Sequence, residues 1–241
     1  MPESVLTAKN FSAGYGRALF SPAELSLAQG NLVSLVGPNG TGKSTILRCF
    51  AGLLEPRTGT VFLDGKPLKE WDARLCAQKI ASVFTRERVP FGMNVREFVS
   101  LGRIPYSQFF DGRSRADEAA IDDAIFRVRM EAFAKREVAA LSDGERSRVF
   151  LARAIASEPE ALLLDEPTAY LDVPNILNLF RLLREMAAER NLAVLLSTHH
   201  LHYAMKFSDK IIALDGKGRV KEGFPDEFTS SHFLEWADET I

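Results

Sequence analysis

The chain has 241 residues, of which 46% are hydrophobic and 26% are charged, and its formal net charge is −2. This length suits one large domain, or one core with an inserted lobe, and it is enough to bury a sizeable core. The near-neutral charge excludes a global positive field that would draw the chain toward nucleic acid or anionic lipid.

The sequence also argues against export and membrane insertion. No apolar run approaches the roughly 18 residues that a membrane helix needs. The first four residues include an acid and no apolar stretch, which is unlike a secretory signal. The two cysteines, Cys49 and Cys76, make no disulfide framework. We therefore expect a cytosolic protein that would act at a membrane only as a peripheral partner.

The first 90 residues are predicted to be rich in strands. The predicted strands are 5–12, typical of an edge strand, then 24–28, 32–36, 60–63 and 80–84. Asp64-Gly65 indicates a hairpin turn after the fourth of these. Each strand is short and is bounded by turn residues.

The period then changes to that of helices. Segments 95–101, 116–129 and 130–135 are helical in composition, within loops that carry Pro90, Pro105 and Gly112. We interpret residues of about 91–144 as a helical lobe inserted into a core made of 1–90 and 145–241.

Helices and strands alternate in the last hundred residues. The predicted helices are 147–157, 176–190 and a tail from Glu227, and the predicted strands are 161–164, 193–197 and 211–214. Continuously apolar strands such as 161–164 are typical of a parallel sheet that is covered on both faces. This half of the chain therefore predicts an α/β core.

Residues 37–45 fit the phosphate-loop pattern G-x-x-x-x-G-K-[ST] at every fixed position. The loop consists of Gly37, Pro38, Asn39, Gly40, Thr41, Gly42, Lys43, Ser44 and Thr45. A predicted strand precedes it and a helical run follows, so backbone N–H groups and a helix N-terminus can surround a phosphate. Lys43 would reach the β- and γ-phosphates, and the Ser44 hydroxyl would bind Mg²⁺. The alternative, a glycine-rich turn that matches by chance, is disfavoured by this context, and the sequence predicts binding of a nucleoside triphosphate.

Two acids follow the apolar strand at 161–164. Asp165 can hold the Mg²⁺ shell, as the second acidic motif of phosphate-loop enzymes does, and Glu166 is placed to act as general base on an attacking water. Read alone, the segment could be a strand followed by an acidic turn. Combined with the phosphate loop, it predicts hydrolysis.

Residues 141–145, Leu-Ser-Asp-Gly-Glu, open a helix. Ser142 and Glu145 have the spacing of a capping box, and Gly144 would let a ligand approach the backbone closely. Taken by itself, the segment is an ordinary helix N-terminus.

The order of these motifs resembles the ATP-binding-cassette (ABC) ATPases over essentially the whole chain. Residues 141–145 are similar to the family signature Leu-Ser-Gly-Gly-Gln or Glu, with Asp143 in the third place. The resemblance implies a phosphate-loop core of mostly parallel sheet and flanking helices, an N-terminal antiparallel β subdomain and the helical lobe. It also implies that Tyr15 stacks on adenine, that Asp172 lies in a loop crossing a dimer interface, and that His199 contacts the γ-phosphate.

The resemblance further implies a homodimer with composite ATP sites. Each ATP, with Mg²⁺, would lie between one chain's phosphate loop and the other chain's signature residues Ser142, Asp143, Gly144 and Glu145. ATP would close the dimer, hydrolysis would open it, and the motion would drive a partner. Lys43, Glu166 and His199 would be the catalytic residues.

Thr85 departs from the family pattern, in which a glutamine touches Mg²⁺ and the attacking water and begins the segment facing the transport partner. A threonine hydroxyl could touch the metal or its water, but it is shorter and has no amide. We therefore expect hydrolysis to survive and coupling to the partner to be altered.

His199, His200 and His202 are close in sequence, so a metal site is an alternative interpretation. Their spacing is not a usual zinc pattern, and no cysteine or fourth histidine is near. The sequence favours His199 as a γ-phosphate contact.

Segments 94–106 and 218–225 resemble importer subunits for iron–siderophore, haem and cobalamin chelates. The prediction is an ATPase subunit at the cytoplasmic face of the inner membrane, bound to polytopic permease subunits and without direct contact with the transported substrate or nucleic acid. The loop at 90–93 is a candidate contact with that partner.

Two alternatives to a transporter subunit stay open. One is an ABC machine without a membrane partner, although the chain lacks the second cassette, the coiled-coil insertion or the basic arm typical of that class. The other is an inactive regulatory nucleotide binder.

Overall fold

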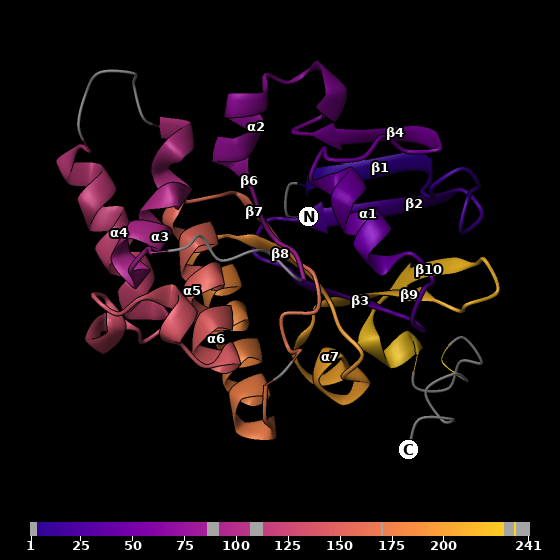
Figure 1. Ribbon diagram of the computed structural model, residues 1–241. Coiled ribbons are helices and arrows are strands. Elements are labelled where there is room, and N and C mark those ends of the chain that lie inside the picture. The colour runs from indigo at the N-terminus through magenta and orange to yellow at the C-terminus, as the bar shows by residue number, and fades with distance from the viewer. Residues whose placement is uncertain (1–3, 86–91, 107–112, 170, 229–233, 235–241) are drawn as a thin grey trace.

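The computed structural model describes residues 4–85, 92–106, 113–169, 171–228 and 234, arranged around two sheets (Figure 1). The smaller sheet is antiparallel, in the order β2-β1-β4-β5. Its strands are β1 (Ser4–Ser12), β2 (Ala23–Ala28), β4 (Thr58–Leu63) and β5 (Lys66–Pro67). This is the antiparallel β subdomain that the resemblance implies.

The prediction that the first strand lies at an edge is wrong. β1 pairs with β2 on one side and with β4 on the other, so that Leu6 lies opposite both Leu27 and Leu63. Alternating burial reports that one face of a strand is covered, and it does not report how many strands flank it.

The larger sheet has the order β10-β9-β3-β8-β7-β6 and is parallel except for β10. Its strands are β3 (Leu32–Val36), β6 (Ile80–Val83), β7 (Ala161–Leu164), β8 (Ala193–Ser197), β9 (Lys210–Leu214) and β10 (Val220–Gly223). Every residue of β3, β7 and β8 is buried, which confirms a parallel sheet covered on both faces.

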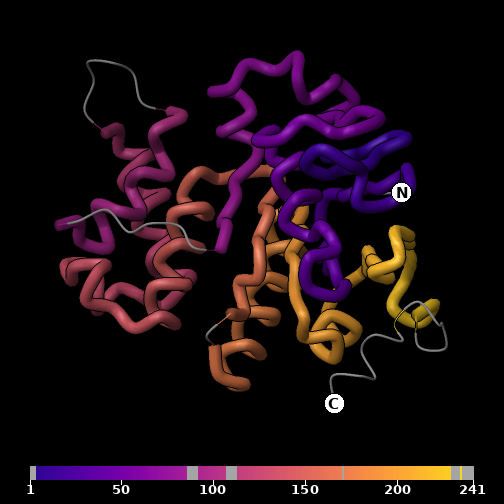
Figure 2. Tube along the Cα trace, turned by 45° about the vertical axis from the view of Figure 1, so that its right-hand side comes forward, coloured from indigo at the N-terminus to yellow at the C-terminus, as the bar shows by residue number. Residues whose placement is uncertain are grey.

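Helices cover both faces of the larger sheet. They are α1 (Lys43–Phe50), α2 (Ala73–Lys79), α3 (Val95–Ser100), α4 (Arg115–Arg127), α5 (Asp143–Ala156), α6 (Val173–Arg190) and α7 (Leu201–Phe207). Short 3-10 turns occupy η1 (Leu68–Glu70), η2 (Leu101–Tyr106), η3 (Glu131–Phe133), η4 (Val138–Ala140) and η5 (Pro225–Glu227). One apolar core joins the two sheets around α1, and a second joins the larger sheet to α3, α4, α5 and α6. In Figures 1 and 2 the magenta α3 and α4 stand beside α5, on the side away from the smaller sheet.

Several boundaries differ from the sequence prediction. The helix predicted at 116–129 ends at Arg127, and Arg129 adopts a left-handed conformation with φ 57°, so 130–135 forms only the turn η3. Helix α5 begins at Asp143, with Ser142 as its cap, as the predicted capping box implies, and it is therefore four residues longer than the helical run predicted from 147. Helices α2 and α7 and strand β10 were not predicted, because α2 and β10 have no fully buried residue and α7 has only Ala204, so none of them shows a clear apolar face in the sequence.

Pro90, Gly112, half of the 90–93 loop and most of the predicted tail lie outside the described residues. Within the part of the chain that the structure describes, no helix is long and apolar enough to cross a membrane.

Candidate functional site

The phosphate loop connects β3, in the middle of the larger sheet, to α1. Gly42 has φ 110° at the N-cap of α1, and a Cβ there would lie 2.9 Å from the Leu19 side chain, so only glycine fits without strain. Lys43 begins the helix and is 7% exposed. Its Nζ donates hydrogen bonds to the carbonyl oxygens of Gly37, at 2.7 Å, and Pro38, at 3.2 Å. The lysine thus lies inside the curve of its own loop.

Burial and two nearby acids act on the pKa of Lys43 in opposite directions. Burial lowers its pKa, while the negative charges of Glu166 and Asp165 oppose that shift. Its Nζ lies 3.8 Å from Glu166 Oε1. The ammonium group therefore connects the phosphate loop to the acidic pair.

Asp165 and Glu166 follow β7, which is separated from β3 by β8. Asp165 is 7% exposed, and its Oδ1 accepts hydrogen bonds from Ser44 Oγ at 2.9 Å and from Ser197 Oγ at 2.8 Å. The Glu166 N–H donates to the same Ser197 oxygen at 2.8 Å. Ser44 and Asp165 present the hydroxyl and carboxylate oxygens that Mg²⁺ prefers, so this donor set fits the metal.

The Glu166 carboxylate is held at both of its oxygens. Oε1 faces Lys43, and Oε2 lies 3.0 Å from Nδ1 of the half-exposed His199. Glu166 itself has φ 49°, a strained conformation for a residue with a side chain. The structure therefore brings Lys43, Ser44, Asp165, Glu166 and His199 into one cluster.

Thr85 follows β6 and reaches the same cluster. Its Oγ1 donates a hydrogen bond to the main-chain oxygen of Asp165 at 2.8 Å. The sequence analysis did not single out Ser197, which contacts both acids. The signal that could have found it is a serine that ends an apolar strand just before Thr198-His199.

The signature residues lie at the start of α5. Ser142 and Glu145 form a capping box, and the hydrogen bonds from Ser142 lower the pKa of Glu145. Asp143 pairs with Arg146 at 3.4 Å, and a Cβ at Gly144 would lie 3.4 Å from Leu171. Among the described residues, no hydrogen bond or ion pair links 142–145 to the phosphate loop of the same chain.

In the described part of the chain, no hydrogen bond or ion pair links Tyr15 or Asp172 to this cluster. The Tyr15 side chain is 65% exposed. Asp172 caps α6, with its Oδ1 accepting from the Asn175 N–H at 3.0 Å.

The rings of His199 and His200 lie with their centroids 4.0 Å apart and are tilted by 40° to each other. Burial and the neighbouring His199 lower the pKa of His200, and Glu166 opposes that shift. In the described ranges, no group of three or more His, Cys, Asp and Glu side chains could hold a metal ion.

A parallel sheet with a phosphate loop after its central strand and an acidic pair two strands away defines a phosphate-loop nucleoside triphosphatase. The family model described as ABC transporter matches residues 20–169. An uncharacterised ABC transporter ATP-binding protein of Methanocaldococcus jannaschii is 34% identical over 92% of this chain and 77% of its own length. The chain belongs to the ABC transporter family as an ATP-binding subunit with ATPase activity.

Two other relatives have names that give a transported molecule. An iron(3+)-hydroxamate import ATP-binding protein of Bacillus subtilis is 36% identical over 90% of this chain and 81% of its own length. A hemin import ATP-binding protein of Rhodococcus jostii is 40% identical, over 87% and 70% respectively.

Solved structures agree on the fold. A chain from a metal-chelate type ABC transporter in an inward-facing conformation matches with a TM-score of 0.85 and 27% identity, over 98% of this chain and 89% of that one. A dimeric ATP-binding cassette in a post-hydrolysis state, bound to ADP and phosphate, matches with a TM-score of 0.79 and 27% identity, over 91% and 98%.

Proposed function

We propose that this chain powers the import of an iron chelate, haem or cobalamin by hydrolysing ATP at the cytoplasmic face of the inner membrane. The observation that carries the hydrolytic part is the Glu166 carboxylate, which is held between Lys43 and His199 beside the phosphate loop. The substrate class is supported by the names of the relatives, which include importers of iron(3+)-hydroxamate and hemin.

Glu166 is the general base in this proposal. It takes a proton from the attacking water while that oxygen bonds to the γ-phosphorus and the bond to the β-phosphate oxygen breaks. His199, which contacts Glu166 Oε2 through Nδ1, contacts the γ-phosphate from the other side. Lys43 exchanges the carbonyl oxygens of its own loop for the β- and γ-phosphates.

Ser44 and Asp165 hold Mg²⁺ in this proposal, and the Thr85 oxygen keeps lone pairs that can accept from a water in the metal's shell. The ion would neutralise the charge that develops on the phosphates. No other residue of the described cluster is needed as a ligand, since Mg²⁺ sites commonly use one or two protein groups together with phosphate and water.

The active unit is a homodimer in this proposal. Residues 142–145 and Asp172 of one chain complete the ATP site of the other, and Tyr15 stacks on adenine. The absence of hydrogen bonds and ion pairs between the described signature residues and their own phosphate loop supports this arrangement, as does the dimeric cassette among the similar structures. We propose the same division of the chain as above, with a helical lobe at about 91–144 inside the nucleotide-binding core.

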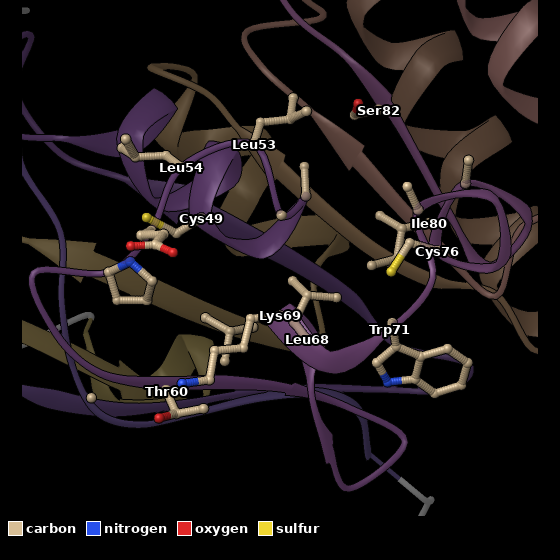
Figure 3. Close-up of a pocket in the computed structure, with 18 residues that line it drawn as sticks. Cys49, Leu53, Leu54, Thr60, Leu68, Lys69, Trp71, Cys76, Ile80 and Ser82 are labelled. Atoms are coloured by element: carbon tan, nitrogen blue, oxygen red, sulfur yellow. The ribbon is translucent and has the colours of Figure 1, made fainter.

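Polytopic permease subunits are the proposed partners, and a pocket beside α1 is their candidate contact. Its volume is about 660 Å³, and side chains from α1, the following loop, η1, α2 and β6 face it (Figure 3). The lining includes Cys49, Leu53, Leu54, Trp71, Cys76 and Ile80. Leu53 is 64% exposed and adds apolar surface at this pocket, where a partner could bury it. The pocket also borders β6, which leads to Thr85 and the segment that the resemblance places toward the transport partner.

The test is a pull-down of the tagged chain from detergent-solubilised membranes of its own cell, with mass spectrometry of the bound proteins. Recovery of a polytopic membrane protein in near-equal amount supports a transporter, and an associated binding protein for iron chelates, haem or cobalamin supports the substrate class. Ribosomes or DNA-associated proteins in its place would instead favour a machine without a membrane partner.

Two matched variants test the contact. Leu53→Glu should lower recovery of the membrane protein at least tenfold. Phe126→Glu, at a similarly exposed position (66%) on α4, should leave recovery unchanged. If Leu53→Glu and the parent chain recover equal amounts of the membrane protein, the pocket is not part of the interface.

A further inference from the structure

We propose that Thr85 and Ser197 are positioning residues that together fix the peptide unit between Asp165 and Glu166, and so set the direction of the catalytic carboxylate. This inference rests on the proposed role of Glu166 as general base. We call the two hydroxyls and the peptide that they hold the peptide clamp.

The register of the larger sheet produces the clamp. β7 lies between β6 and β8, with Val83 and Leu196 both opposite Leu164, the last residue of β7. The chain just beyond Leu164 therefore has one flanking strand on each side. Thr85 comes from the end of β6, and Ser197 is the last residue of β8.

Ser197 holds the nitrogen end of the peptide. Its side chain is fully buried, its hydroxyl donates to Asp165 Oδ1, and its oxygen accepts from the Glu166 N–H, each at 2.8 Å. The single hydroxyl thus acts as donor and acceptor at once. An apolar residue at this position would leave the part-buried Glu166 N–H without that partner, which is costly.

Thr85 holds the oxygen end of the same peptide. Its Oγ1 donates to the carbonyl oxygen of Asp165 at 2.8 Å. Because a peptide unit is planar, hydrogen bonds at its oxygen and at its nitrogen from opposite sides fix its orientation. The threonine therefore has a structural task of its own at the position where the family pattern has glutamine.

The backbone of Glu166 explains why such a clamp is useful. Its φ of 49° lies in the left-handed region, which a residue with a side chain keeps only where surrounding contacts over-determine it. The φ rotation occurs about the bond that joins the clamped peptide to Glu166 Cα, so a freed peptide would let the carboxylate swing away from Lys43 and His199. A misplacement of about 1 Å can reduce the rate of catalysis a hundredfold.

The test compares variants that remove one hydroxyl each. Thr85→Val keeps the shape of an exposed side chain and removes only its hydroxyl, and Ser197→Ala removes the buried hydroxyl. We expect each variant to lower kcat for MgATP about tenfold or more and to leave KM within about threefold. Thr85→Ser should restore most of the kcat that Thr85→Val loses. The double variant should lose less than the product of the two single losses, because both act on one peptide.

The matched control is Ser34→Ala. Ser34 is also a fully buried serine of the larger sheet, but its hydroxyl bonds to Ser208 Oγ at 2.7 Å, outside the cluster. Ser34→Ala should keep the parent kcat.

Four results would overturn the clamp: an unchanged kcat in Thr85→Val, an equal loss in Thr85→Ser, an equal loss in Ser34→Ala, or a rise in KM without a change in kcat. Glu166→Gln separates this failure from that of the proposed function. If Glu166→Gln is inactive while Thr85→Val is normal, only the clamp is wrong. If Glu166→Gln is active, the general base itself is wrongly assigned.

Discussion

Replacing Glu166 by glutamine tests the chemistry most directly, because the shape of the side chain is kept and only its charge and basicity are lost. A positioned general base contributes about 10² to 10⁴ in rate, which corresponds to about 2.7–5.4 kcal/mol at 1.36 kcal/mol per tenfold. We therefore expect kcat to fall at least 100-fold. The amide can still bond to His199 Nδ1, which lies 3.0 Å from the present carboxylate, so the site should keep its geometry.

The same substitution should leave ATP binding intact or strengthen it. The attraction between Lys43 Nζ and Glu166 Oε1, at 3.8 Å, is on the order of 4 kcal/mol at an effective dielectric constant of 20. Removing it frees the ammonium for phosphate and removes a negative charge that repels ATP. ATP should therefore accumulate on a stable dimer.

The assay combines steady-state phosphate release with light scattering of the purified chain in MgATP. Glu185→Gln, an exposed glutamate on α6, is the control for a lost surface charge and should behave as the parent chain. Turnover of Glu166→Gln at the parent rate would refute the assignment of the base.

Two predictions concern stability. Arg103→Met should lower the free energy of unfolding by about 3 kcal/mol or more. Arg103 is 7% exposed, and its guanidinium donates hydrogen bonds to Asp117 Oδ1 and to the Ala156 carbonyl oxygen, at 2.8 Å each. The change to methionine would leave Asp117 without its counter-ion. Thermal unfolding should show a decrease in Tm of roughly 6–12 °C, and a decrease under 2 °C would contradict this account. Burial holds the pKa of His200 below that of the unfolded chain, so the unfolded state binds more protons and stability should fall as pH drops below about 6.5. Denaturant titrations at several pH values should show that His200→Gln weakens this fall of stability with decreasing pH. An unchanged pH dependence in His200→Gln would show that other groups cause the fall.

The motifs of the site were predictable because each occupies a short stretch of sequence. Glycines and a lysine between an apolar strand and a helix, or two acids after an apolar strand, need no knowledge of the rest of the chain. The same is true of the capping box at Ser142 and Glu145, which the structure has as predicted. The continuously apolar strands β3, β7 and β8 were also predicted, as were the amphipathic helices α4, α5 and α6, whose period extends over several turns.

Lateral relations in the sheets were not predictable in the same way. The edge assignment of β1 failed since the alternation of Leu6 and Ala8 is the same whether a strand has one neighbour or two. Ser197 was overlooked for a related reason. As one polar residue at the end of an apolar strand it carries no pattern, and it becomes informative only when β8 is known to lie beside β7.

This limit explains why the sequence shows at Thr85 only a missing glutamine, whereas the structure shows a hydrogen bond that the threonine makes. By the motif alone, residue 85 is a shorter side chain that lacks the amide of glutamine. The order of the strands in the sheet shows the neighbour of residue 85. The Thr85 hydroxyl lies 2.8 Å from the carbonyl oxygen of Asp165. That carbonyl shares its peptide with the N–H held by Ser197, so the two hydroxyls act on one rigid unit although they lie more than 100 residues apart in the chain. A substitution at residue 85 must therefore be judged together with residue 197, because a glutamine placed there would remove the hydroxyl that donates to the Asp165 carbonyl oxygen.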